Sequence, residues 1–259
     1  MKKLFLLFAL AFVAMSCGDH CPSLCPSNEI WYTNGSTTEP INPSEEDVFG
    51  VNIISNTYDS EKKCWVIKFD GDVTTIGDYA FYNCSSLRSV TIPDSVTTIG
   101  VSAFDGCTGE LIVNCNIPHG YYYPYYRSVF YGSKFTTVTI GDSVTTIGRY
   151  AFCKCSSLTC VTIGDSVTTI GDYAFSDCSS LRSVTIPDSV NSIGHEAVCD
   201  CSSITSVYCK ATTPPALGGA AFYNNPSDPK IYVPKESVAA YKSAPHWSDY
   251  ADDIVGYNF

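Results

Sequence analysis

The sequence predicts a β-rich solenoid built from stacked 23-residue repeats. Three observations lead to this prediction: one segment recurs at 23-residue intervals, isoleucines keep one phase through its copies, and apolar and polar residues alternate beside it. A single repeat cannot bury its apolar residues alone, whereas stacked repeats form continuous internal columns. We expect a right-handed coil of about seven to eight turns, with parallel strands, short helical turns and a C-terminal cap.

The recurring segment is found at residues 73–84, 96–107, 144–155, 167–178 and, in a weaker form, 190–201. Its fourth position is always isoleucine: Ile76, Ile99, Ile147, Ile170 and Ile193. The gap of 48 residues between Ile99 and Ile147 equals two periods plus two residues. One degenerate, tyrosine-rich repeat therefore lies between them.

Each part of a repeat has a physical interpretation. Residues 89–92 alternate between polar and apolar side chains, which predicts a strand with one buried face. Residues 93–95, Pro-Asp-Ser, turn the chain, and residues 96–99 form a second short strand that ends at Gly100. Residues 103–107 then pack inward on a short helical turn and close the coil.

The N-terminus has the pattern of a secretory signal. Lys2 and Lys3 precede an apolar stretch at residues 4–14, which is too short to span a bilayer but has the length of a signal-peptide core. Residues 1–16 are therefore expected to be removed. Residues 14–17, Ala-Met-Ser-Cys, resemble the lipobox of bacterial lipoproteins, which implies that Cys17 is lipidated, although Ala14 and Met15 depart from the usual pattern. The alternative is ordinary secretion with cleavage nearby.

The rest of the chain divides into three parts. Residues 17–47 are rich in proline and polar residues and predict a lipid-anchored flexible tether, in which residues 30–32 are an apolar exception able to pack on the first repeat. Residues 48–234 form the predicted solenoid, and residues 235–259 form the predicted cap. A cap is needed because an open solenoid end exposes apolar side chains and unpaired strands.

The repeat resembles the BspA-like leucine-rich repeats of surface proteins of Bacteroides. The pattern L-x-x-V-T-I-P-D-S-V-T-T-I-G-x-x-A-F-x-x-C-S-S carries the resemblance over about residues 64–234. The resemblance implies an outer-membrane lipoprotein exposed at the cell surface. It also implies adhesion or recognition, with host extracellular proteins or other bacterial surface proteins as partners.

Composition limits the partners further. The net charge of −11 repels nucleic acid and anionic lipid headgroups, so we expect neither to bind. After residue 16 no apolar run reaches the roughly 20 residues of a spanning helix, so the only expected membrane contact is the lipid anchor.

The positions of the cysteines fit a role in core packing better than a role in catalysis or metal binding. Five of the 14 occupy one repeat position and should form a buried column of free thiols: Cys84, Cys107, Cys155, Cys178 and Cys201. In the two C-x-C pairs, 153–155 and 199–201, the first cysteine is expected to face elsewhere, which disfavours a zinc site. Cys21 and Cys25, near His20, could form a local disulfide or bind a metal, but a plain spacer fits the composition better. We predict no metal site.

No pattern for catalysis emerges, so the chain is not expected to be an enzyme or to hold a cofactor. His195 follows a repeat glycine at a position where Asp78 and Asp172 stand in other copies, which suggests solvated surface. The sequence contains neither a G-x-S-x-G elbow nor a phosphate-binding loop.

Two surfaces remain as binding candidates. One is the outward face of the long strands, with columns of threonine together with Arg88, Arg182 and Tyr208; these columns can equally be plain strand formers. The other is the degenerate repeat, where five tyrosines precede Arg127: Tyr121, Tyr122, Tyr123, Tyr125 and Tyr126. Tyrosine suits protein interfaces and stacks on sugars, so glycan binding is the alternative function. The tyrosines can equally pack on the solenoid flank, and a structural surface protein without a specific ligand remains a third possibility.

Overall fold

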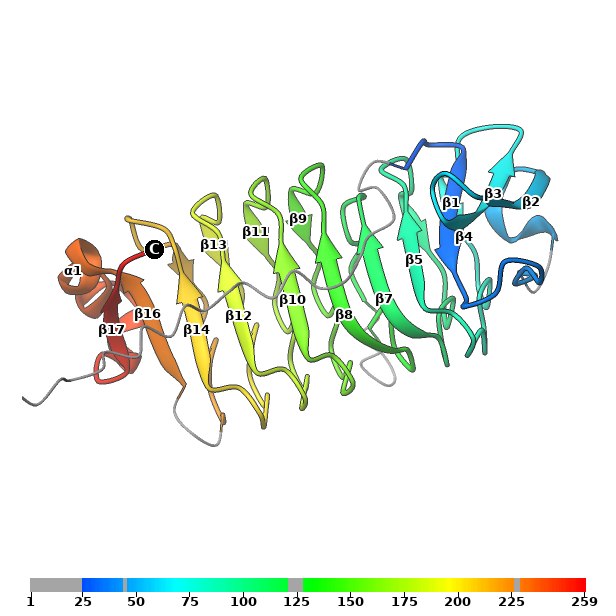
Figure 1. The fold of residues 1–259 in the computed structure, drawn as a ribbon. Coiled ribbons are helices and arrows are strands. Elements are labelled where there is room, and N and C mark those ends of the chain that lie inside the picture. Colours follow the sequence, from blue (N-terminus) through cyan, green and yellow to red (C-terminus); the bar gives the residue numbers. More distant parts are fainter. Residues whose placement is uncertain (1–24, 44–45, 121–127, 226–228) are drawn as a thin grey trace, which may run out of the picture.

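The computed structural model describes residues 25–43, 46–120, 128–225 and 229–259. The chain forms a parallel-strand solenoid of about 8 turns, which confirms the predicted fold. Figure 1 shows the long strands side by side along the length of the molecule, with the C-terminal helix at one end and an antiparallel hairpin at the other. Each turn has three sides: a long strand, a short strand, and a segment of tight turns that we call the turn edge.

The long strands follow one another in sequence order and are parallel. Those of the first half, which form one sheet, are β5 (Ser89–Ile92), β7 (Thr108–Val113), β8 (Lys134–Ile140) and β10 (Cys160–Ile163). Those of the second half, which form another, are β12 (Ser183–Ile186), β14 (Ser206–Cys209), β16 (Lys230–Pro234) and β17 (Ile254–Tyr257). The two sheets meet between β10 and β12.

The short strands are two residues each, because the repeat glycine ends them. They are β4 (Thr75–Ile76), β6 (Thr98–Ile99), β9 (Thr146–Ile147), β11 (Thr169–Ile170), β13 (Ser192–Ile193) and β15 (Ala216–Leu217). Ile117 of the degenerate repeat pairs with Ile147, so this repeat continues the stack, as its length predicted. Gly194 shows why glycine follows each isoleucine, since a Cβ there would lie 2.4 Å from the backbone nitrogen of Asp172.

The turn edge contains tight turns where the sequence suggested short helical turns. Two residues per turn have left-handed backbone conformations, for example Tyr173 (φ 57°) and Asp177 (φ 58°), and such residues interrupt an α-helix. Their N–H groups point along the solenoid and donate to the next turn: Tyr173 to His195 O at 2.9 Å, and Asp177 to Cys199 O at 3.0 Å. The turn edge is thus a third hydrogen-bonded ladder.

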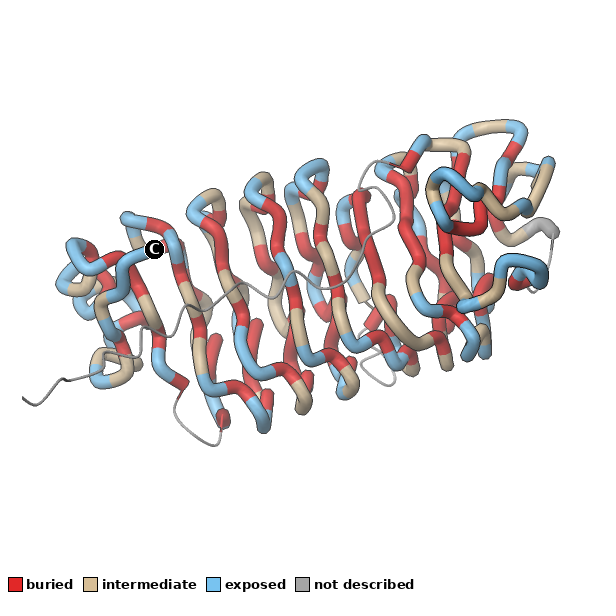
Figure 2. The backbone as a smooth tube through the Cα atoms, viewed as in Figure 1, coloured by how far each residue is buried: buried red, intermediate tan, exposed pale blue. Residues whose placement is uncertain are grey.

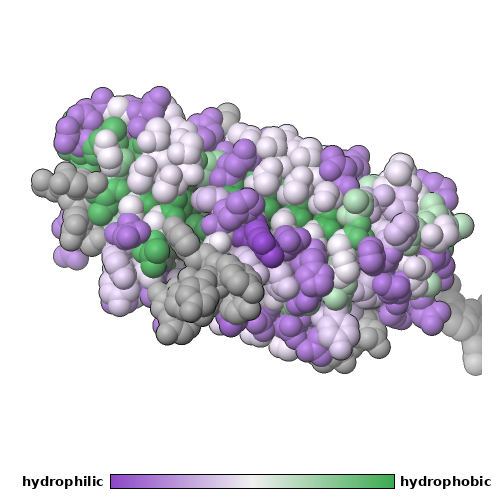
Figure 3. All heavy atoms as spheres, turned by 180° about the vertical axis from the view of Figure 1, so that it is seen from behind, coloured by the Kyte–Doolittle hydropathy of each residue, from purple (hydrophilic) through white to green (hydrophobic). Residues whose placement is uncertain are grey.

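The core is a set of columns parallel to the solenoid axis. Phe130, Phe152 and Phe175 stack at 5.0 and 5.4 Å between ring centroids, with isoleucine and valine columns beside them. Figure 2 shows buried residues recurring at the same place in each turn. Seen from the side opposite to the long strands, apolar residues form a band that runs along the molecule between polar ones and is widest at the N-terminal end (Figure 3).

The N-terminal end is formed by three antiparallel strands. Strands β1 (Glu29–Thr33), β3 (Cys64–Phe69) and β2 (Ile53–Asp59) extend the first sheet beyond β5, and η1 (Glu46–Phe49) packs Phe49 against Phe69. The apolar exception at residues 30–32 does pack on the first turn, but as a strand, and Ile30 and Tyr32 are fully buried. Ordered structure therefore begins well before residue 48, because these side chains close the open end of the core.

The C-terminal end is covered by η2 (Lys235–Ser237), α1 (Val238–Ser243) and η3 (Trp247–Tyr250), which lie between β16 and β17. Tyr241 and Trp247 are fully buried, and Trp247 Nε1 donates to Pro215 O at 2.8 Å. No following turn accepts the Phe222 N–H, and the Tyr250 hydroxyl accepts it instead, at 3.2 Å. The helices thus satisfy the end of the ladder as well as covering the core. Within the described ranges, none of the helices is long and apolar enough to cross a bilayer.

Candidate binding surface

The outward face of the long strands changes character along the solenoid. Strand register places Thr139 beside Thr162, and Thr185 beside Tyr208, Tyr232 and Val255, in one outward column on consecutive strands. At the N-terminal end, Thr91 pairs with Trp31 of β1 and is only 1% exposed. The middle of the face is therefore polar and open, whereas its C-terminal end is aromatic.

Four aromatic residues gather at that C-terminal end, and we call Tyr208, Tyr232, Tyr257 and Phe259 the tyrosine cluster. The rings of Tyr208 and Tyr232 stack at 4.8 Å with 13° between their planes. Tyr257 meets both of them edge-on, and Phe259 packs on Tyr257 at 5.1 Å. Tyr257 is 36% exposed and Phe259 53% exposed, so the cluster forms an aromatic surface open to solvent.

A shallow pocket of about 300 Å³ adjoins the cluster. Tyr257 and Phe259 form part of its wall, and Lys210 and Glu236 place one positive and one negative side chain in it. An aromatic patch with polar residues at its edge resembles the composition of protein interfaces, in which tyrosine is enriched at the core and the rim is polar.

The structure separates the residues that the sequence analysis selected. Tyr208 is in the cluster, and Arg182 precedes β12, on the neighbouring strand. Arg88 precedes β5, five strand spacings or about 24 Å away, so it belongs to no common site with Tyr208. The tyrosines of residues 121–126, Arg127 and the lipidation candidate Cys17 lie outside the described residues, so these predictions stay untested.

Sequence reasoning missed Tyr232, Tyr257 and Phe259. The sequence did contain a signal for Tyr232. Ile231-Tyr-Val and Val207-Tyr-Cys have the same alternation of apolar residues around a tyrosine, and the two tyrosines are paired in the sheet. Their spacing is 24 residues rather than 23, which hid the match. Tyr257 lies at the end of β17, within the predicted cap, and no repeat pattern reaches it.

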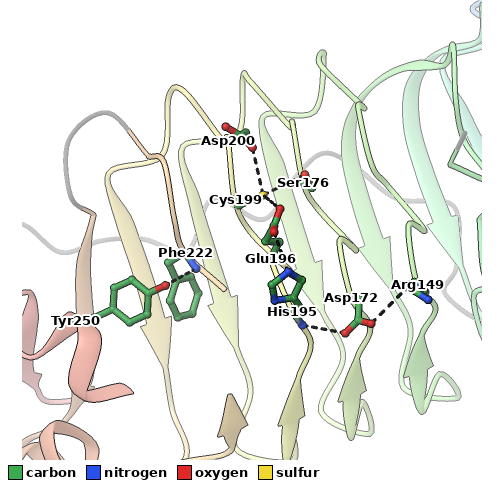
Figure 4. Close-up of polar contacts among 9 residues, drawn as sticks. All are labelled: Arg149, Asp172, Ser176, His195, Glu196, Cys199, Asp200, Phe222 and Tyr250. Carbon is green, nitrogen blue, oxygen red and sulfur yellow. Dashed lines mark hydrogen bonds and ion pairs between the residues drawn. The ribbon is translucent and has the colours of Figure 1, made fainter. Parts of the chain in front are cut away.

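A second group of polar side chains lies on the turn edge (Figure 4). Asp172 Oδ1 accepts the His195 N–H at 2.8 Å, and its Oδ2 lies 3.6 Å from Arg149 Nε. His119 likewise accepts a hydrogen bond from the next turn, because its Nδ1 accepts the backbone N–H of Arg149 at 2.8 Å. The position after the repeat glycine is thus solvated, as predicted for His195, but it also joins adjacent turns through backbone hydrogen bonds.

His195 and Cys199 are near each other, yet they are not arranged as a nucleophile and its base. His195 Nε2 lies 2.8 Å from Glu196 Oε1, and Cys199 Sγ donates to Glu196 Oε2 at 3.5 Å and to Asp200 Oδ2 at 3.3 Å. Burial, followed by these carboxylates, raises the pKa of Cys199 well above its usual value. A protonated, buried thiol is a poor nucleophile, so this group supports packing rather than catalysis.

Four of the five repeat cysteines are buried as expected, whereas Cys84 is only half-buried. Cys107, Cys178 and Cys201 are buried free thiols whose Sγ atoms donate to phenylalanine carbonyls of the preceding turn at 2.9–3.2 Å. The first cysteine of each C-x-C pair lies outside the main core cluster, as expected, yet Cys153 and Cys199 are only 3% and 1% exposed. Both lie in a second buried column, separated by Ser176, whose hydroxyl is 3.2 Å from Cys199 Sγ. Among the described residues, no group of three potential ligands could hold a metal ion.

A comparison with family models agrees with this architecture. A family model described as the BspA type leucine rich repeat region matches residues 51–123 and 125–244 with six copies. A crystal structure of a leucine-rich repeat protein from Bacteroides ovatus is 24% identical over 60% of this chain and 51% of its own, with a TM-score of 0.34. A leucine-rich cell surface protein from Faecalibacterium prausnitzii is 22% identical over 62% of this chain and 58% of its own, with a TM-score of 0.31. The chain thus spans little more than half the length of these proteins. No curated protein matches it.

Proposed function

Because the chain belongs to the BspA-type leucine-rich repeat family, we propose that it is a non-enzymatic recognition protein of the bacterial surface that binds a protein partner through its long-strand face. The family and its cell-surface relatives suggest a protein-interaction or structural role at the surface. The observation that carries the finer proposal is the tyrosine cluster, because it concentrates exposed aromatic side chains at one place on an otherwise polar face.

The packing of the cluster favours a protein over a glycan. Sugars stack on free ring faces, but Tyr208 and Tyr232 each cover one face of the other's ring, and Tyr257 contacts both rings edge-on. Exposed ring edges and hydroxyl tips suit the mixed apolar and polar contacts of protein interfaces. Glycan binding therefore depends on the tyrosines of residues 121–126, as the sequence suggested.

A binding assay with two matched tyrosine variants tests the proposal. We expect immobilised protein to retain proteins from host extracellular matrix, and replacement of Tyr208, Tyr232 and Tyr257 by serine to weaken retention at least ~30-fold, as for interface hot spots. The control replaces Tyr79, Tyr82 and Tyr223, which are also exposed but lie on the turn edge, and it should bind like the wild type.

Two outcomes would contradict the proposal: no protein retained above an unrelated acidic control, or equal retention by both variants. A glycan array with a variant that has serine at Tyr121, Tyr122, Tyr123, Tyr125 and Tyr126 tests the alternative. Sugar binding that this variant loses, without any protein retention by the wild type, would favour glycan capture.

We also propose that Cys17 anchors the protein to the outer membrane as a lipid-modified N-terminus, which would make the mature chain begin at residue 17. The sequence support is the signal-like segment before it and the resemblance of residues 14–17 to a lipobox. Mass spectrometry of the mature protein should find a diacylglycerol adduct that Cys17→Ser abolishes. An unmodified wild-type N-terminus would rule out the anchor.

A further inference from the structure

The column of repeat cysteines is not uniform. Four of its members are buried, but Cys84, in the first turn of the repeat, is only half-buried. Cys84 packs at the margin of the core rather than inside it. It is therefore the most exposed member of this column.

Cys84 and Cys107 converge on one carbonyl oxygen. The Cys84 N–H donates to Phe81 O at 3.2 Å, and Cys107 Sγ donates to the same oxygen at 2.9 Å. The sulfur of Cys107 therefore lies beside the main chain of Cys84. Adjacent turns of a sheet are ~4.8 Å apart, which is within the ~4.4–6.8 Å that a disulfide requires between Cα atoms.

The two thiols also differ in acidity. The nearby Cys107 side chain lowers the pKa of Cys84, and the same contact, followed by burial, raises the pKa of Cys107. A thiolate is the nucleophile in thiol–disulfide exchange. The accessible sulfur is thus the one that ionises first, and its buried neighbour keeps its proton until a reaction has taken place.

We propose that Cys84 and Cys107 are a redox-sensitive pair, in which Cys84 attacks a small disulfide and Cys107 converts the product into a crosslink between two consecutive turns. In the first step the Cys84 thiolate bonds to one sulfur of RSSR and expels RS⁻. In the second, the Cys107 sulfur loses its proton, bonds to the Cys84 sulfur and expels the second RS⁻. Two protein thiols are oxidised, one small disulfide is reduced, and two RSH leave after protonation.

The interior of the solenoid supplies a matched pair for comparison. Cys155 N–H and Cys178 Sγ converge on Phe152 O at 3.1 and 3.2 Å, as Cys84 and Cys107 do on Phe81 O. Cys155 and Cys178 are both buried, and burial raises the pKa of each. The two pairs thus share the same hydrogen-bond geometry, and they differ only in the burial and the acidity of their first thiol.

Peptide-resolved mass spectrometry of the folded protein tests the pair. With limiting maleimide at pH 8, Cys84 should react at least ~10-fold faster than Cys155 or Cys178. After exposure to 2-hydroxyethyl disulfide, peptides holding Cys84 and Cys107 should be found crosslinked, while Cys155 and Cys178 stay reduced. Equal labelling of Cys84 and Cys178, or no Cys84–Cys107 crosslink in protein that stays folded by circular dichroism, overturns the proposal.

Two variants separate the roles of the sulfurs. Cys107→Ser should stop the reaction at the first step, so that a mixed disulfide with hydroxyethanethiol accumulates on Cys84. Cys84→Ser should leave Cys107 reduced and unlabelled. A crosslink from Cys107 to another cysteine in the Cys84→Ser variant would contradict the assignment of Cys84 as the attacking sulfur. The wild-type peptide map decides the proposal even where a variant fails to fold.

Discussion

The protein should unfold steeply between about pH 9 and 11 when it is kept reduced. Burial raises the pKa of Cys115, Cys155 and Cys201 to about 12, and that of Cys153 and Cys209 to about 11. In an unfolded chain these thiols lose their protons near pH ~8.5. Stability from the protonated thiols is complete below that pH and is lost as the pH rises toward the folded-state values.

The size of the effect follows from the number of thiols. Each contributes about 1.4 kcal/mol per pH unit within this window, so five contribute up to ~7 kcal/mol per unit. A domain is usually stable by only ~5–15 kcal/mol, so one or two pH units suffice to unfold it. Urea denaturation at pH 7.5, 9 and 10 measures the change directly.

Single cysteine variants identify the cause. Cys155→Ser removes one buried thiol and should make the pH dependence shallower by about 1.4 kcal/mol per unit, whatever its effect at neutral pH. Cys84→Ser is the control, because the pKa of Cys84 is lowered rather than raised. A urea midpoint that stays constant from pH 7.5 to 10 would contradict the prediction.

Truncation of Trp247 should destabilise the protein by about 4 kcal/mol. This indole is fully buried, packs against Phe222 and Tyr241, and donates to Pro215 O at 2.8 Å. Trp247→Ala leaves a cavity beneath the cap, and it removes the hydrogen-bond donor of the Pro215 carbonyl. Because solenoid stability is a sum over neighbouring turns, loss of the cap should fray the structure from its C-terminal end.

Trp247→Phe is the matched variant, since it keeps an aromatic ring and loses the hydrogen bond and part of the volume. It should cost about 1–2 kcal/mol. Hydrogen exchange then locates the damage: amides of β15 and β16 should exchange faster in Trp247→Ala, while those of β8 keep their protection. A loss below 1 kcal/mol for Trp247→Ala, or uniform loss of protection, would argue against a local capping role.

The repeats were predictable because each turn is formed by contacts with the neighbouring turns alone. Ile76 and Ile99 stand 23 residues apart, and neighbouring turns repeat the same contacts, so the sequence period is also the structural period. The column of Cys107 and Cys178 followed for the same reason. The buried position of Cys153 did not, because its column exists only where Ser176 and Cys199 supply small neighbours.

The two ends were harder to predict. Strand β3 pairs in antiparallel fashion with both β1 and β2, and this arrangement depends on contacts between distant segments such as Tyr32 and Trp65 rather than on a period. The tyrosine cluster joins Tyr208 of the last repeats to Tyr257 of β17. Tyr257 becomes a neighbour of Tyr208 only after the chain passes through α1 and returns to the sheet.

If Cys17 is the lipid anchor, the N-terminal end of the solenoid lies near the membrane and the C-terminal end lies farther from it. Only eight peptide steps separate Cys17 from Cys25, so Cys25, just before β1, stays within ~28 Å of the attachment point. The tyrosine cluster lies at the far end, seven strand spacings or about 34 Å beyond β5. The solenoid then acts as a spacer that holds the tyrosine cluster away from the lipid headgroups.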